Sequence, residues 1–74
     1  MLLKLVNIDS FTIFSGVKSV SLYKEKNKNI VLGVSYEDGN NIEYVISEWK
    51  DNHYQNIYTA FLMNNKGETI EKIR

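Results

Sequence analysis

The sequence predicts a mainly β fold, with one antiparallel, curled sheet or small barrel of five or six strands formed by residues 1–74 as a single domain. Apolar and polar residues alternate with a period of two along several short runs, which is the pattern of half-buried strands. Turn-forming residues separate these runs. The chain contains no proline and no Gly- or Ser-rich linker that would mark a domain boundary.

The first half of the chain contains four predicted strand segments. Leu2 to Ile8 is the first, and Ser10 to Ser15 continues it or forms a second before a bend or bulge at Gly16. Val17 to Lys24 alternates between an apolar and a polar face. The polar run 24–29 is a predicted turn, and Asn29 to Tyr36 again alternates apolar and small residues.

The second half contains two predicted hairpins. Glu37 to Asn41 is the turn of the first hairpin, because Asp38 and Gly39 adopt a positive φ at low cost, and residues 42–47 form its return strand. Residues 57–63, the turn 64–67 and the tail 68–74 form the second hairpin.

Residues 52–64 fit two alternatives. Tyr54, Ile57, Tyr58, Phe61 and Leu62 follow the i, i+3, i+4 spacing of a helix face, which would make the fold α+β with one short helix at 52–64. The aromatic and β-branched content of 57–63, and the turn that follows it, favour a strand there. We expect the core to contain Leu5, Ile13, Val20, Leu22, Ile30, Leu32, Val34, Val45 or Ile46, Phe61 and Ile70.

The composition indicates which covalent or metal-based stabilisation the chain can have and in which cellular compartment it is expected. The chain has no cysteine, so no disulfide can form, and His53 is its one histidine, which argues against a structural zinc site. A chain of this size that needs further stabilisation would gain it by forming a homo-oligomer. No apolar run approaches the ~20 residues that span a bilayer. We therefore expect a cytoplasmic protein without a membrane partner.

The charge is balanced overall but segregated along the chain. Nine basic and nine acidic residues give a net charge of zero. Residues 18–28 hold four lysines against one glutamate, and residues 37–51 hold five acidic residues against one lysine. The alternatives are solvated loops and edges, or a polarised surface whose acidic side meets a charged partner.

No catalytic, metal or cofactor site is predicted. His53 beside Asp51 is interpreted as a loop histidine, and Glu37 to Asn41 lacks the spaced ligand series of a calcium loop. The chain offers no combination of nucleophile, base and oxyanion site, so we expect no enzyme. Tyr23 among the lysines of 18–28 is a weaker indication of single-strand nucleic-acid binding.

The predicted contact surface is the acidic stretch 37–51 with the aromatic residues beside it. Trp49 and two tyrosines fall in or beside the least regular part of the chain, and such side chains are common interface anchors. The alternative for Trp49 is a residue that caps the core. The candidate partner-binding residues are Asp38, Glu43, Glu48, Trp49, Asp51, Tyr54 and Tyr58.

Two segments resemble small phage-encoded inhibitors. Residues 37–48, with Phe11 to Gly16 upstream, look like the central hairpin of an anti-CRISPR family that blocks Cas9 and places a helix after the hairpin. Tyr54 to Arg74 is similar in layout to the last hairpin of the phage inhibitor of uracil-DNA glycosylase. Both families are acidic, whereas this chain is neutral.

The resemblances imply a non-enzymatic phage or mobile-element protein that binds and blocks a bacterial host protein, such as an antiviral-defence nuclease, in the host cytoplasm. The alternatives are a homo-oligomeric assembly protein and a β-barrel that binds single-stranded nucleic acid.

Overall fold

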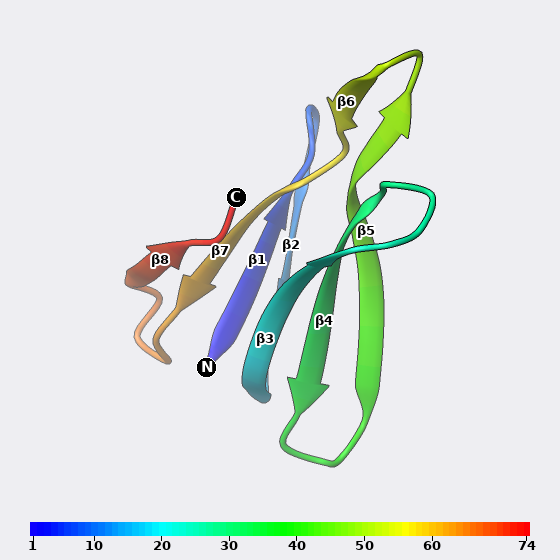
Figure 1. The fold of residues 1–74 in the computed structure, drawn as a ribbon. Helices are drawn as coiled ribbons and strands as arrows, with labels where there is room; N and C mark the ends of the chain where they lie inside the picture. Colours follow the sequence, from blue (N-terminus) through cyan, green and yellow to red (C-terminus); the bar gives the residue numbers. More distant parts are fainter.

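The computed structural model describes residues 1–74 and consists of two antiparallel four-stranded sheets (Figure 1). We call them sheet A, with strand order β2-β1-β7-β8, and sheet B, with strand order β3-β4-β5-β6. The mainly β, antiparallel prediction is confirmed, although eight strands in two sheets replace the expected single sheet or barrel of five or six. The strands are β1 (Leu2–Val6), β2 (Phe11–Phe14), β3 (Val17–Lys24), β4 (Ile30–Tyr36), β5 (Asn41–Lys50), β6 (His53–Asn56), β7 (Thr59–Met63) and β8 (Thr69–Lys72).

The chain passes between the two sheets at two corners. β2 continues into β3 through Gly16, whose φ of +68° is a conformation that a residue without a Cβ adopts at little cost. Just after this bend, the Val17 N–H donates to the Met1 carbonyl over 3.0 Å, next to β1 in sheet A. From Val17 onward, β3 pairs with β4 in sheet B. At the second corner, between β6 and β7, the Ile57 N–H donates to the Ile46 carbonyl over 2.8 Å. The corners hold the inner faces of the sheets together.

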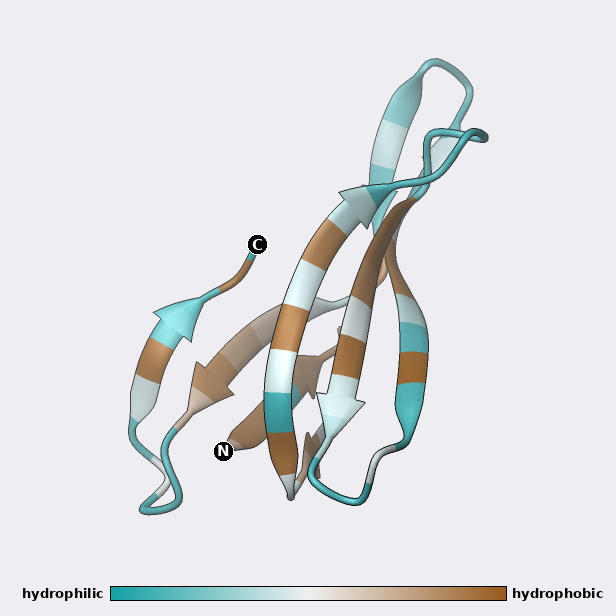
Figure 2. Ribbon diagram, turned by 60° about the horizontal axis from the view of Figure 1, so that its bottom comes forward, coloured by the Kyte–Doolittle hydropathy of each residue, from teal (hydrophilic) through white to brown (hydrophobic).

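The inner faces enclose one apolar core. Figure 2 shows the apolar residues of the strands in brown, alternating with polar ones along β3. β4 is a central strand of sheet B, and its residues Ile30, Leu32 and Val34 alternate inward as the period of two requires. The eight residues of the core cluster are Leu3, Leu5, Val17, Ile30, Leu32, Val34, Ile46 and Ala60.

The predicted core is confirmed at Leu5, Ile30, Leu32, Val34 and Ile46, and Val20 packs against it, whereas Phe61 on the central strand β7 is half-buried and lies outside the core. Val45 is 38% exposed and points to the other face of sheet B from its neighbour Ile46, which is fully buried. The other exposed residues of the predicted core belong to edge strands, which have a neighbour on one side only. These three are Ile13, Leu22 and Ile70.

Residues 52–64 contain β6 and β7 and no helix, so the helical alternative is wrong and the predicted strand is confirmed, with β7 beginning at Thr59. β7 is a central strand between β1 and β8 and buries residues on both faces, with Ala60 inside and Met63 on the opposite face. When a strand is apolar on both faces, its apolar residues can also fall at the i, i+3, i+4 spacing of a helix face, which is why the sequence allowed both alternatives. The structure contains no helix long and apolar enough to cross a membrane.

Both predicted hairpin turns are confirmed. In the β4–β5 turn the Asp38 carboxylate accepts from the Asn40 N–H over 3.0 Å, and Gly39 has a φ of +90°. In the β7–β8 turn the Asn64 Oδ1 accepts from the N–H groups of Lys66 and Glu68, at 2.9 and 3.0 Å. These side-chain bonds satisfy backbone groups that the strands leave free.

Candidate functional site

The candidate site lies at the tip of the β5–β6 hairpin, where the chain's one tryptophan meets a tyrosine. Trp49 and Tyr54 are directly opposite each other in the β5–β6 ladder. Their rings are 4.9 Å apart, in an edge-to-face arrangement with planes at 67°. Both side chains are half-buried. This pair geometry is favourable for aromatic rings and leaves part of each ring accessible to a partner.

A cation lies over each ring of this pair. The Lys28 Nζ is 4.8 Å from the centroid of the Trp49 ring, and the Arg74 guanidinium carbon is 5.4 Å from the centroid of the Tyr54 ring. Both distances fall within the ~6 Å range of cation–π attraction. We call Lys28, Trp49, Tyr54 and Arg74 the cation–aromatic row. Its four side chains come from the β3–β4 turn, β5, β6 and the segment after β8.

The β3–β4 turn reaches the row because it lies at the same end of the molecule as the β5–β6 hairpin (Figure 1). The Trp49 N–H donates to the Asn29 Oδ1 over 2.9 Å, so a side chain of the turn extends the β4–β5 ladder. Lys28 has a φ of +74°, which is costly for a residue with a Cβ. Within the turn the Lys28 N–H donates to the Glu25 carbonyl over 2.9 Å, and this conformation places Lys28 beside the tryptophan.

Beneath the row, a buried polar group fixes the position of Arg74. Ser47 is 0% exposed, and its hydroxyl donates to the Asn56 Oδ1 over 2.6 Å. The Arg74 Nε donates to the same hydroxyl oxygen over 3.1 Å. Ser47 lies opposite Asn56 in the ladder, two positions before Trp49, and therefore on the same face as the tryptophan. The row thus rests on a hydrogen-bonded support.

The structure brings together four of the seven residues that the sequence singles out. Glu48, Trp49, Asp51 and Tyr54 belong to the β5–β6 hairpin, although Glu48 points to the other face from Trp49 because successive side chains in a strand alternate. Asp51 is in the two-residue turn with a φ of +51°. The His53 Nδ1 lies 3.1 Å from the backbone carbonyl oxygen of Asp51, and the ring is exposed.

The other three residues lie elsewhere. Asp38 is in the β4–β5 turn, at the opposite end of β5 from Trp49, about 25 Å along the strand at ~3.3 Å per residue. Glu43 is on the outer face of sheet B, opposite Gly33. Tyr58 lies between β6 and β7 and packs against the core. A partner-binding surface centred on Trp49 therefore does not include Asp38.

On the outer face of sheet B, Tyr23 lies over Gly33. Its Cε1 is 3.5 Å from the position that a Cβ on Gly33 would take. A side-chain hydrogen bond with Glu43, together with desolvation, raises the pKa of Tyr23 to about 12. Tyr23 thus covers Gly33 and interacts with Glu43. It is not part of the cation–aromatic row.

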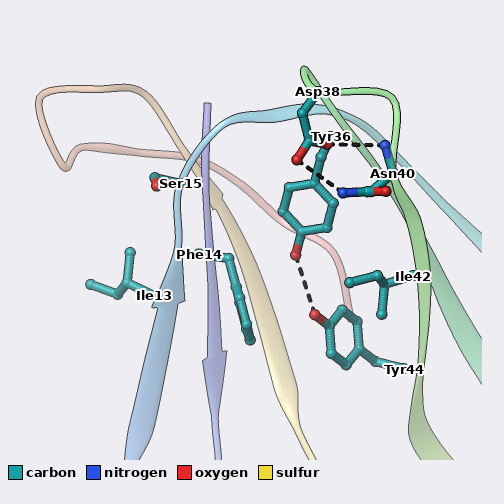
Figure 3. Close-up of a pocket in the computed structure, with 8 residues that line it drawn as sticks. All are labelled: Ile13, Phe14, Ser15, Tyr36, Asp38, Asn40, Ile42 and Tyr44. Atoms are coloured by element: carbon teal, nitrogen blue, oxygen red, sulfur yellow. Dashed lines mark hydrogen bonds between the residues drawn. The ribbon is translucent and has the colours of Figure 1, made fainter.

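A second feature is an open hollow of about 420 Å³ between the end of β2 and the β4–β5 hairpin (Figure 3). The Tyr36 and Tyr44 hydroxyl oxygens are 3.2 Å apart inside it, and the Phe14 and Tyr44 rings are 5.3 Å apart. Burial and the hydrogen bond with Tyr44 raise the pKa of Tyr36 to about 12. The residues that line it are Ile13, Phe14, Ser15, Tyr36, Asp38, Asn40, Ile42 and Tyr44.

Sequence reasoning identified Trp49 and Tyr54 but not the two cations of the row or the hollow. Lys28 belongs to the basic segment 18–28, and Arg74 belongs to the last hairpin. Only the pairing of distant strands brings either one to the aromatic pair, so no local pattern could have indicated it. The structure contains no group of three His, Cys, Asp or Glu side chains that could hold a metal ion.

Comparison with protein-family models, with curated proteins and with solved structures finds no match to the chain.

Proposed function

We propose that this chain is a non-enzymatic domain that binds a bacterial host protein and blocks it, with the cation–aromatic row as the centre of the contact. The observation that carries the proposal is the half-buried Trp49–Tyr54 pair with a cation over each ring. Tryptophan, tyrosine and arginine are the residue types that dominate binding energy at protein interfaces.

Two members of the row are held by hydrogen bonds within the chain. The Trp49 backbone N–H donates to the Asn29 Oδ1 over 2.9 Å, and the Arg74 Nε donates to the Ser47 hydroxyl over 3.1 Å. A contact surface that is already ordered loses less conformational entropy on binding. The two cations suit a partner surface in which carboxylates surround an apolar patch, since charge complementarity contributes specificity and association rate.

The resemblances of residues 37–48 and 54–74 to phage inhibitors are the ground for proposing a phage or mobile-element origin, although β6 and β7 stand here in place of the helix that follows the hairpin in the anti-CRISPR family. These resemblances also make an antiviral-defence nuclease or a repair enzyme the candidate target. Blocking requires that the row cover a surface which the host protein uses for its own ligand. This part of the proposal is inferred from the resemblances and not from the geometry of the row.

Affinity capture from a bacterial lysate, followed by mass spectrometry of the retained proteins, tests the proposal. We expect one host protein to be retained in stoichiometric amount, and we expect its activity to fall when the purified chain is added in excess. If no host protein is retained, or if the retained protein keeps full activity when saturated, the proposed function is wrong.

The row also favours one second candidate, a binder of single-stranded nucleic acid. Aromatic rings beside cations stack with bases and contact phosphates, and Lys24 and Lys26 lie near Lys28 in the same part of the chain. Oligothymidylate would then quench the Trp49 emission, and the affinity would fall steeply with added salt. Unchanged emission at low salt would exclude this candidate.

A further inference from the structure

The four outer strands of the two sheets differ in how their edges are protected. β3 carries Lys18 and Lys24 and a register shift after Val17, and β8 carries charged residues and a register shift in its ladder with β7. β6 is polar from His53 to Asn56. Charges, bulges and short polar strands are the usual devices that prevent a free edge from pairing with another chain.

β2 is as short as β6 and β8, at four residues, but it carries neither a charge nor a bulge. Its sequence is Phe-Thr-Ile-Phe, without a charge, and it pairs with β1 in an unbroken register. Phe11 is 60% exposed and Ile13 is 45% exposed. β2 has extensive contact with β1 alone, so the edge of β2 that faces away from β1 is free. An uncharged, apolar and regular edge of this kind is a template for an added strand.

The hollow lies directly beside this edge. Ile13, Phe14 and Ser15 form its wall on the β2 side, and residues of the β4–β5 hairpin form the opposite wall (Figure 3). Its apolar side chains suit an aliphatic side chain of modest size, and the Tyr36 and Tyr44 hydroxyl groups offer a polar anchor. The edge and the hollow together give room for an extended chain and for one of its side chains.

Asp38 is the one charged residue that lines the hollow. Glu43 lies on the outer face of sheet B, and Lys4, which is opposite Ile13 in the β1–β2 ladder, has its Nζ 4.6 Å from the centroid of the Phe11 ring. A segment that binds here is therefore favoured if it carries a basic residue near its apolar anchor.

We propose that β2 accepts an extended segment of another protein as an added strand of sheet A, with an aliphatic side chain in the hollow and a lysine or arginine two residues away, next to Asp38. Residues two apart lie on the same face of a strand, which places both side chains toward the β4–β5 hairpin. A second copy of this chain fits less well, because residues 9–17, which contain β2, include no cation. The surface is independent of the cation–aromatic row at the other end of β5.

The probe is a capped octapeptide of sequence Thr-Val-Thr-Leu-Thr-Arg-Thr-Val, added to the isotope-labelled protein at about 1 mM, the concentration at which weak complexes become visible. We expect the backbone amide resonances of residues 11–15 and 36–44 to shift, and the β2 amides to exchange more slowly with solvent. A peptide with proline in place of the threonine between leucine and arginine should bind at least about tenfold more weakly, because it lacks a backbone donor and is restricted in conformation. Replacing the arginine by glutamate should weaken binding in the same direction.

Two matched variants locate the site. Ile13→Lys places a charge on the β2 edge and should abolish the shifts, whereas Ile70→Lys places the same charge on the β8 edge, where the isoleucine is 58% exposed, and should leave them unchanged. A thermal unfolding curve for each variant verifies that it is folded. Trp49→Ala should bind the peptide as the parent chain does, so this test and that of the proposed function can fail separately.

Three results would overturn the proposal. The first is the absence of shifts at residues 11–15, and the second is equal binding of the arginine and glutamate peptides. The third is a dimer mass in sedimentation that Ile13→Lys converts to a monomer mass, because a second copy would then occupy the edge.

Discussion

The side-chain nitrogen of Lys28 lies 4.8 Å from the centroid of the Trp49 ring, although the two residues belong to different hairpins. The backbone reinforces this contact, since the N–H of Trp49 donates to Asn29, the next residue along the β3–β4 turn. The turn and the β5–β6 hairpin therefore act as one unit.

Replacing Lys28 with glutamine should remove the cation from the tryptophan while keeping most of the aliphatic side chain. We expect a loss of about 0.5–1 kcal/mol in the free energy of unfolding, the range of exposed cation–π contacts. The Trp49 emission, which comes from the chain's one tryptophan, should also change. Urea denaturation measures the first quantity and fluorescence the second. Lys26→Gln is the control, and if it had the same effect, a specific contact would be excluded.

Replacing Ser47 with alanine should destabilise the chain by about 0.5–1.5 kcal/mol, because the fully buried Ser47 hydroxyl loses its hydrogen bonds with Asn56 and Arg74, whose side chains can then bind water. The exposed Ser19→Ala serves as the control. A double-mutant cycle with Arg74→Gln should give a coupling energy of at least about 0.5 kcal/mol. Additive effects would show that the arginine does not depend on Ser47.

Replacing Gly16 with alanine should cost about 1–2 kcal/mol of stability, since its φ of +68° disfavours residues with a Cβ. Nothing lies within 4 Å of the position that the new Cβ would take, so the cost comes from the backbone alone. Gly16→Asn should cost less, because asparagine tolerates this conformation better. Equal losses in thermal or urea unfolding would indicate that the corner needs glycine for another reason.

Raising the pH should destabilise the fold through Tyr23 and Tyr36. Hydrogen bonding to Glu43 raises the pKa of Tyr23, and burial raises the pKa of Tyr36, in each case to about 12. The unfolded chain has tyrosine pKa values of about 10, so the folded state holds these protons more tightly. The stability that they contribute is fully present below pH ~10 and is lost as the pH rises toward ~12.

The measurement is the urea midpoint across this pH range. The decline should be shallower in a Tyr23→Phe, Tyr36→Phe double variant than in the parent chain, because the variant lacks both groups. Parallel declines would contradict the assignment. An ultraviolet titration should show Tyr23 and Tyr36 ionising above the usual range of tyrosine.

The sequence predicted the strands and turns where local patterns determine them. The alternation in residues 30–36, the Asp38–Gly39 turn and the 64–67 turn all form as expected. The sequence did not reveal that Gly16 bends the chain from one sheet into the other, because a glycine within a strand pattern indicates a bend without showing where the chain goes next. The division into two sheets depends on that bend.

The candidate site was also predictable only where a local sequence pattern determines it. Trp49 and Tyr54 are five positions apart, and a two-residue turn places them opposite each other, so a local pattern contained their pairing. Lys28 and Arg74 reach them only through the pairing of β4 with β5 and of β7 with β8. The sequence grouped Asp38 with Trp49 by charge, whereas a ten-residue strand separates them.

The measurement that tests the central claim most directly is the affinity of the captured host protein for three forms of this chain. Trp49→Ala removes the ring that contacts both Lys28 and Tyr54, and we expect it to weaken binding by at least about thirtyfold, or roughly 2 kcal/mol, as truncation of an interface anchor does. Tyr23→Ala, on the outer face of sheet B, should bind as the parent chain does. If Trp49→Ala kept the parent affinity while remaining folded, the cation–aromatic row would not be the contact surface.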